Sequence, residues 1–183
     1  MFELSRFSFS FAMGCVMFVM LSFSTLATAN HADDYPSQEV AELILGIIHF
    51  SRWPDSKKDL QLCIVGETKH ADLLLNTDLT VGDYHIDSQW IDDAQLLEYV
   101  SLCQVIFFGH YNVRQINDFY AQLYGMPVLT IDEWNEDCRI GGMFCLHNNQ
   151  GRLGFKVNLD AVGRSQVRVQ PNVLRLGQHR ANK

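Results

Sequence analysis

The chain has 183 residues, 48% of them hydrophobic, which suffices for one domain with a substantial core. Its formal net charge of −7 at neutral pH excludes a protein that binds nucleic acid or an anionic membrane through its overall charge. Beyond the N-terminal segment, no second stretch is apolar and long enough to span a bilayer.

Residues 1–29 have the pattern of a secretory signal peptide. Arg6 supplies a positive start, an almost uncharged run covers residues 7–26, and the segment ends on the small residues 27–29. The alternative is an uncleaved membrane anchor, since the run is about long enough to cross a bilayer. The small polar residues near its end favour cleavage, so we expect an exported protein whose single domain covers residues 30–183.

The first half of this domain predicts alternating helices and strands. Apolar spacing of i, i+3 and i+4 over residues 37–50 predicts a core-facing helix, with Ser37 as its N-cap and Pro54 beyond its end. A short apolar run over residues 60–65 predicts a buried strand. The expected elements that follow are a short helix at 68–76, a strand near 81–86 and a helical turn within 92–99.

The second half contains the strongest strand signal. The continuous apolar run within residues 103–109 predicts a strand buried on both faces. A helix capped by Asn112 follows, with Gly125 at its C-terminal end. The remaining expected elements are a strand at 127–131, a hairpin of 143–147 with 153–158, a short helix at 159–165 and a final apolar piece at 167–176.

This alternation predicts an α/β single-domain sandwich. Strands that alternate with helices form parallel sheets through right-handed crossovers. We therefore expect a mostly parallel central sheet, an antiparallel hairpin at one edge and flanking helices.

Four cysteines remain after signal cleavage: Cys63, Cys103, Cys138 and Cys145. An even number in an exported chain indicates two disulfides, with three pairings to choose from. Neighbouring strands could bring Cys63 to Cys103, and a tight bend separates Cys138 from Cys145, so we propose these two bridges. The shorter loop also raises a redox role as a hypothesis, because short loops can strain a bridge.

No motif indicates catalysis, a cofactor or a metal site. The cysteines lack the close pairs of a zinc site or redox motif, and no two histidines share a helix face at i, i+4. Asp132 and Glu133 follow a predicted strand, where α/β folds often place functional acids, but no partner nucleophile is identifiable. We therefore expect a protein that is not an enzyme.

Two groups of residues are candidates for binding. Lys156, Arg164 and Arg168 gather near the predicted hairpin and the helix after it, and arginines suit carboxylates and phosphates. Arg52 and Trp53 follow the first helix, and both residue types often anchor interfaces. A solvated face and a cap on the core are the respective alternatives; a small anionic ligand or an acidic patch on a partner is the functional hypothesis.

Several segments together resemble the YfiR family. These segments occur in order at residues 50–54 (FSRWP), 62–64 (LCI), 103–109 (CQVIFFG), 138–146 (CRIGGMFCL), 155–161 (FKVNLDA) and 164–165 (RS). Their order and spacing extend over nearly the whole mature chain.

The resemblance implies a periplasmic regulator. Members of the family bind the periplasmic domain of an inner-membrane diguanylate cyclase and hold it inactive, and an OmpA-like outer-membrane lipoprotein can sequester them, which raises cyclic-di-GMP and favours biofilm. The resemblance also implies a homodimer, a cysteine pattern similar to Cys63/Cys103 and Cys138/Cys145, and a small-ligand site near Arg164 and Arg168. The alternative function is a periplasmic small-ligand-binding sensory module that uses the basic patch.

Overall fold

The structure is a computed structural model that describes residues 36–75, 78–92, 95–111, 113–135, 137–149 and 151–181. The predicted signal peptide and the predicted cap Asn112 lie outside these residues. Among the residues described, no helix combines the length and the hydrophobicity that crossing a membrane requires.

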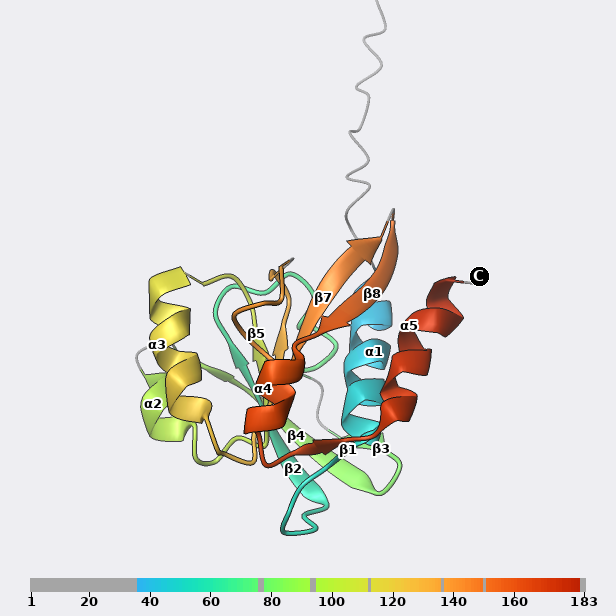
Figure 1. Cartoon of the computed structure of the whole chain (residues 1–183). Helices are drawn as coiled ribbons and strands as arrows, with labels where there is room; N and C mark the ends of the chain where they lie inside the picture. The colour runs from blue at the N-terminus through green and yellow to red at the C-terminus, as the bar shows by residue number, and fades with distance from the viewer. Residues whose placement is uncertain are drawn as a thin grey trace, which may run out of the picture. The chain divides into compact units, whose positions relative to one another are not determined.

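The described chain alternates helices and strands, as the sequence predicts (Figure 1). The elements of its first half are α1 (Ser37–His49), β1 (Ser51–Arg52), β2 (Asp59–Val65), β3 (Leu79–Val81), β4 (Tyr84–Ile91), α2 (Leu96–Tyr99) and β5 (Val105–Phe108). Those of the second half are α3 (Val113–Leu123), β6 (Leu129–Asp132), β7 (Phe144–Asn149), β8 (Arg152–Val157), α4 (Leu159–Arg164), β9 (Arg168–Val169), a 3-10 turn η2 (Pro171–Val173) and α5 (Leu174–Ala181).

Seven strands form one curled sheet in the order β3-β4-β2-β5-β6-β7-β8. The five inner strands run parallel, while β3 pairs with β4 and β8 pairs with β7 in the antiparallel direction. The α/β sandwich is therefore confirmed, with antiparallel pairing at both edges. The second hairpin arises because Gly82, at φ +59°, turns the chain between β3 and β4 inside the segment that predicted one strand.

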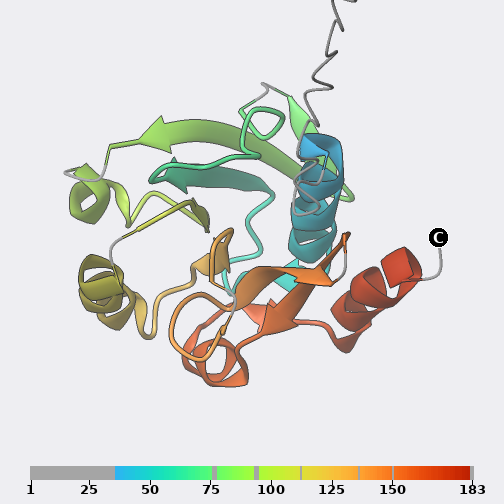
Figure 2. The ribbon, with the colours of Figure 1, turned by 90° about the horizontal axis from the view of Figure 1, so that it is seen from above.

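Helices cover both faces of this sheet (Figure 2). α1 and α5 lie on one side, and α2 and α3 lie together on the other. Because side chains alternate along a strand, β2, β4 and β5 each contribute to two cores. The core beneath α1 contains Leu62, Ile64, Val105, Phe107, Leu129 and Ile131, and the core beneath α2 and α3 contains Cys63, Val65, Ile106 and Phe108.

Both proposed disulfides are present. Cys63 and Cys103 have Cα atoms 5.8 Å apart and join β2 to the segment before β5. Cys138 and Cys145 have Cα atoms 5.7 Å apart and close the bend that leads into β7. The first bridge joins segments that lie side by side in the sheet, and the second joins β7 to the loop before it.

Two local predictions are wrong. Ser37 is the first residue of α1 rather than its cap, and its Oγ lies 3.4 Å from His70 Nδ1. Residues 68–75 form bends and turns instead of a helix. The Glu133 carboxylate accepts hydrogen bonds from the backbone amides of Lys69 and His70, so a tertiary contact that no local pattern contains fixes this segment.

Candidate functional site

A groove of about 830 Å³ lies beside β1 and β9. Residues 52–54 form one side of it, and residues 162–163 and 165–169 form the other. Antiparallel pairing of β1 with β9 builds the groove, since it places Ser51 opposite Val169 and Arg52 opposite Arg168. The sheet thus brings together two candidates from opposite ends of the domain, Arg52 and Arg168.

The pairing places two guanidinium-bearing side chains on one face. Directly opposite residues of an antiparallel pair project to the same side, and like charges in this position are destabilising. Arg52 donates hydrogen bonds to the carbonyls of His49 (2.6 Å) and Ser51 (2.7 Å), and it lies over the ring of Tyr84 at 5.8 Å. Among the residues described, no carboxylate forms an ion pair with Arg168. An anion bound between the two arginines would relieve their repulsion.

Trp53 is a core residue with one edge at the groove. The side chain is 5% exposed, and its Nε1 donates a hydrogen bond to the carbonyl of Gln104 at 3.2 Å. Its ring packs edge-on against Tyr84, with centroids 5.5 Å apart. Trp53 therefore fixes the floor that positions Arg52, which matches the cap on the core more closely than an exposed interface anchor.

The other two basic candidates lie outside the groove. Arg164 is in α4, pairs with Asp160 and covers the ring of Tyr124 at 4.5 Å. Lys156 is on β8 opposite Cys145, and its charge acts on the carboxyl of Asp137. The five candidates are therefore divided between the groove, α4 and the hairpin.

Sequence analysis did not single out Gln166, which lines the groove two residues before Arg168. Gln166 lies in the bend between α4 and β9, where no strand or helix periodicity in the sequence marks it as a lining residue. Its Nε2 donates to the carbonyl of Gly125, which ties the segment after α4 to the end of α3.

The carboxyl end of the sheet, where α/β folds commonly bind ligands, is partly closed by the chain itself. Glu67 and His110 form a β-bridge across the ends of β2 and β5. Above them, Glu133 places its carboxylate on the amides of Lys69 and His70, both at 2.9 Å. Glu133 thus occupies the position that a ligand's anionic group would take.

Asp132 also has a structural role. Its carboxylate accepts hydrogen bonds from the hydroxyl of Tyr120, from Asn135 Nδ2 at 2.8 Å and from the amide of Gly142 at 3.0 Å. Burial raises the pKa of Asp132 above its ordinary 3.8, against the effect of these donors, and burial raises the pKa of Tyr120 well above its ordinary 10.0. Asp132 and Glu133 therefore hold loops in place in this structure.

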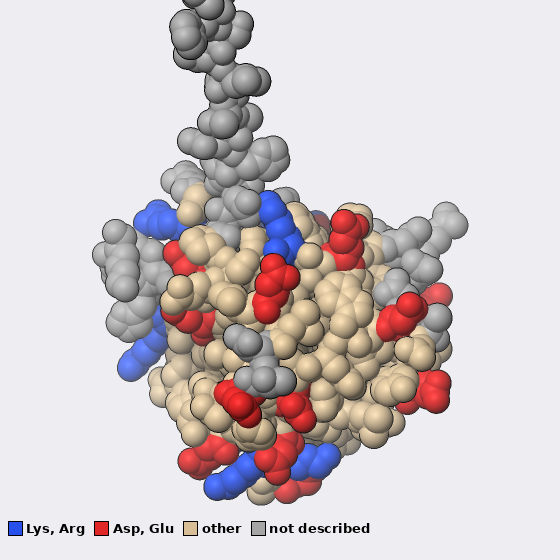
Figure 3. Space-filling view, turned by 180° about the vertical axis from the view of Figure 1, so that it is seen from behind, with Lys and Arg blue, Asp and Glu red and all other residues tan. Residues whose placement is uncertain are grey.

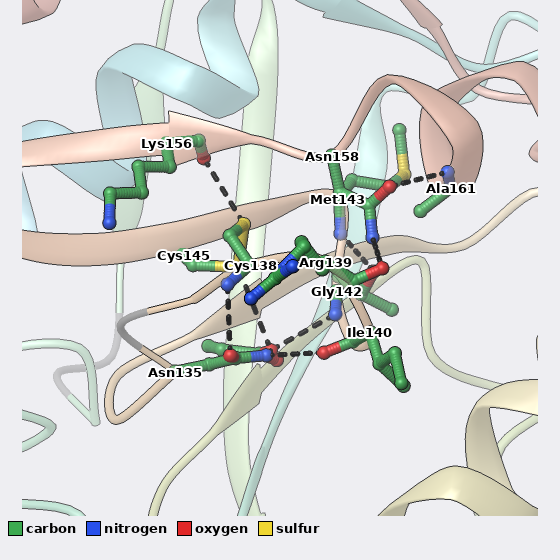
Figure 4. Close-up of a disulfide and its surroundings, with 12 residues drawn as sticks. Asn135, Cys138, Arg139, Ile140, Gly142, Met143, Cys145, Lys156, Asn158 and Ala161 are labelled. Atoms are coloured by element: carbon green, nitrogen blue, oxygen red, sulfur yellow. Dashed lines mark hydrogen bonds between the residues drawn. A yellow bond between two sulfur atoms is a disulfide. The ribbon is translucent and has the colours of Figure 1, made fainter.

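Asn135 connects Asp132 to the shorter disulfide (Figure 4). Its Nδ2 also donates to the carbonyl of Ile140 at 2.7 Å, and its Oδ1 accepts from the amide of Cys138 at 3.1 Å. Asn158, whose side chain caps α4 by accepting from the amide of Ala161, reaches the carbonyl of Arg139 from the other side. The bend between the cysteines is thereby fixed by side chains as well as by the bridge.

Charge is mixed on the face seen in Figure 3, where basic side chains lie mostly near the margins and beside acidic ones. Among the described residues, no group of three or more histidine, cysteine or acidic side chains could hold a metal ion. The groove between Arg52 and Arg168 is a candidate for a small ligand.

The model of a family described as DUF4154, YfiR/HmsC-like, matches residues 37–178. The match begins at the first turn of α1 and ends within α5, so it includes every element that builds the groove and both disulfides.

Proposed function

The chain belongs to the YfiR/HmsC-like family, and from this premise we propose that it binds the periplasmic domain of an inner-membrane diguanylate cyclase and holds that enzyme inactive. Family membership supports a periplasmic regulator of the cyclic-di-GMP system, and a regulatory rather than a catalytic protein. The family match over residues 37–178 is the observation that carries the proposal. Two disulfides fit an oxidising compartment outside the cytoplasm.

The proposed mechanism is a population shift. A regulator that binds the cyclase can silence it only by binding the inactive state more tightly than the active one. A ratio of 99 inactive to 1 active, starting from the reverse, requires about 5.5 kcal/mol of differential binding. An inhibitor that acts by stoichiometric binding needs a stable surface and no catalytic group. This agrees with the structural role of Asp132 and Glu133, whose carboxylates hold loops in place.

The test is deletion of the gene. We expect the deletion to raise cellular cyclic-di-GMP and biofilm formation, and a plasmid copy of the whole chain to restore both. A copy that lacks residues 1–29 is the matched control, because it encodes the same domain without the predicted export signal. An unchanged cyclic-di-GMP level in the deletion strain would contradict the proposal.

Two further partners belong to the same proposal. We propose that an OmpA-like outer-membrane lipoprotein sequesters the regulator and relieves the inhibition, and that the regulator acts as a homodimer. Sedimentation of the purified protein over a concentration series would measure the dimer directly. Pull-down with the lipoprotein's periplasmic domain should compete with pull-down by the cyclase domain.

A second candidate function is a sensory module that binds a small anionic ligand, and the facing pair Arg52 and Arg168 favours it. We expect inorganic phosphate or citrate, at constant ionic strength, to raise the melting temperature of the wild type. Arg168→Ala should abolish this shift without lowering basal stability, because it removes a like-charge repulsion. Lys156→Ala removes a basic side chain outside the groove and should leave the shift intact. A shift that survives Arg168→Ala would exclude the groove as the anion site.

A further inference from the structure

Four large hydrophobic side chains near α3 and α4 are at least half exposed. Trp134 and Tyr124 are 51% and 53% exposed, and Ile140 and Leu159 reach 67% and 78%. No other large hydrophobic residue in the described part of the chain is as exposed as Ile140 or Leu159. Exposed apolar side chains that lie together mark interaction surfaces, whereas scattered ones are ordinary. An interaction surface therefore requires that these four side chains be neighbours.

Trp134 and Ile140 are neighbours at the bend that precedes the hairpin. Both line one hollow of about 230 Å³. Asn135, the residue after Trp134, donates a hydrogen bond from its Nδ2 to the carbonyl of Ile140 at 2.7 Å. Figure 4 shows the Ile140 side chain directed away from the disulfide and the hairpin. The bend thus presents two large apolar side chains at one hollow.

Leu159 and Tyr124 extend this surface toward α4 and the end of α3. The Nδ2 of Asn158 lies 3.5 Å from the carbonyl of Arg139, so the segments that carry Leu159 and Ile140 are in contact. Tyr124 lines a second, small hollow together with Gly141, the residue after Ile140. These contacts join Tyr124, Trp134, Ile140 and Leu159 into one surface, which we call the α3–α4 patch.

The described charged residues at the rim of this patch are paired within the chain. Arg139 forms an ion pair with Asp137 at 2.8 Å. Arg164 pairs with Asp160 and also lies over the ring of Tyr124, 4.5 Å from its centroid. Each of these arginines therefore has an aspartate beside it, and the four residues together carry no excess of either charge.

This local balance of charge favours a second copy of the chain as the occupant of the patch. The whole chain carries a net charge of −7, so two copies repel each other unless they meet where the charges are balanced. A balanced rim also lacks the excess positive charge that would select an anionic membrane or an acidic partner. In a two-fold dimer the same patch lies on both sides of the interface, so arginines of one copy can face aspartates of the other.

We propose that two copies of this chain associate through the α3–α4 patch in a two-fold dimer, with Ile140 and Leu159 in the buried centre of the interface. Tryptophan, tyrosine and arginine, which the patch and its rim contain, are the residue types that interfaces favour. The proposal rests on the homodimer of the proposed function and adds the location of its interface. It concerns the dimer alone, and inhibition of the cyclase is tested separately by the gene deletion.

Sedimentation of the protein purified from the periplasm, over a concentration series, tests this location. Leu159→Glu places two like charges at the centre of the interface, so it should raise the dissociation constant of the dimer about tenfold or more. Leu159 is largely exposed within one copy, so the substitution removes little packing, and the melting temperature of the monomer should stay unchanged.

Trp90→Glu is the matched control for an added charge. Trp90 is 50% exposed and lies on β4, which two strands separate from β6 in the sheet. We expect its dissociation constant to equal that of the wild type. A dimer that survives Leu159→Glu would overturn the location while leaving the homodimer itself intact. A wild type that stays monomeric would overturn both.

Mixed variants test the two-fold contact directly. Leu159→Lys should also weaken the dimer when it is studied alone. An equimolar mixture of Leu159→Glu and Leu159→Lys should recover dimers, because opposite charges then meet across the interface. A mixture that remains monomeric would contradict the self-contact. If the wild type is monomeric and Leu159→Glu abolishes pull-down of the cyclase domain, the patch is a partner surface and the proposal is wrong.

Discussion

The Glu133 side chain fixes the backbone of a segment that lies far from it in the sequence. Its carboxylate lies 2.9 Å from the amides of both Lys69 and His70, and it is 8% exposed. Burial raises the pKa of Glu133 above its ordinary 4.5, although the two amides and the side chain of Trp134 favour the charged form. Burial is therefore the stronger effect on this group.

This raised pKa predicts a specific dependence of stability on pH. Between the ordinary value of 4.5 and the raised value, the folded protein keeps a proton that the unfolded chain releases. The free energy of unfolding contributed by Glu133 is then greatest at low pH and falls as pH rises through that window. Glu133→Gln removes this titration, so the wild type should lose stability relative to the variant as pH rises above the ordinary value of 4.5.

Urea denaturation of both proteins across that range measures the difference. Subtraction of the two curves removes the contribution of every other titrating group, Asp132 included. If the wild type gains stability relative to Glu133→Gln as pH rises, the backbone amides outweigh burial and the assigned direction is wrong.

At the level of elements, the sequence predicts best where local pattern and tertiary contact agree. The apolar run of β5 is buried on both faces, and the apolar stripe of α1 faces the core, because burial alone determines both. The helix expected at residues 68–76 is absent from the described residues 68–75, where Glu133, directly after β6, binds the backbone amides of Lys69 and His70. No local window contains that partner, so propensity could not indicate it.

The residues of the candidate site could be chosen from the sequence, but their arrangement depends on tertiary contacts. Arg52 and Arg168 could be chosen from residue type alone, but their pairing depends on two very short strands, β1 and β9.

At the scale of the whole molecule, we expect the two disulfides to contribute unequally to the free energy of unfolding. Their loops do not overlap in sequence, so their contributions should add. Chain-entropy estimates give about 4 kcal/mol for the Cys63–Cys103 bridge and about 2.5 kcal/mol for the Cys138–Cys145 bridge. The sum of about 6.5 kcal/mol is large beside the 5–15 kcal/mol of net stability that is typical of a folded domain. The domain therefore depends on the oxidising compartment that its predicted signal would reach.

Paired Cys→Ala variants test this dependence. The Cys63/Cys103 pair should lose more unfolding free energy than the Cys138/Cys145 pair, and the variant that lacks all four cysteines should lose about the sum. For a domain of this size, about 6.5 kcal/mol corresponds to a fall in melting temperature of roughly 13–26 °C. Reduction of the wild type with a thiol should lower its melting temperature by a similar amount, which separates loss of the bridge from loss of side-chain packing. The opposite result would be a larger loss of unfolding free energy in the Cys138/Cys145 pair. It would show that the hydrogen bonds of Asn135 and Asn158 to residues 138–145, rather than chain entropy, govern the stability of this part of the fold.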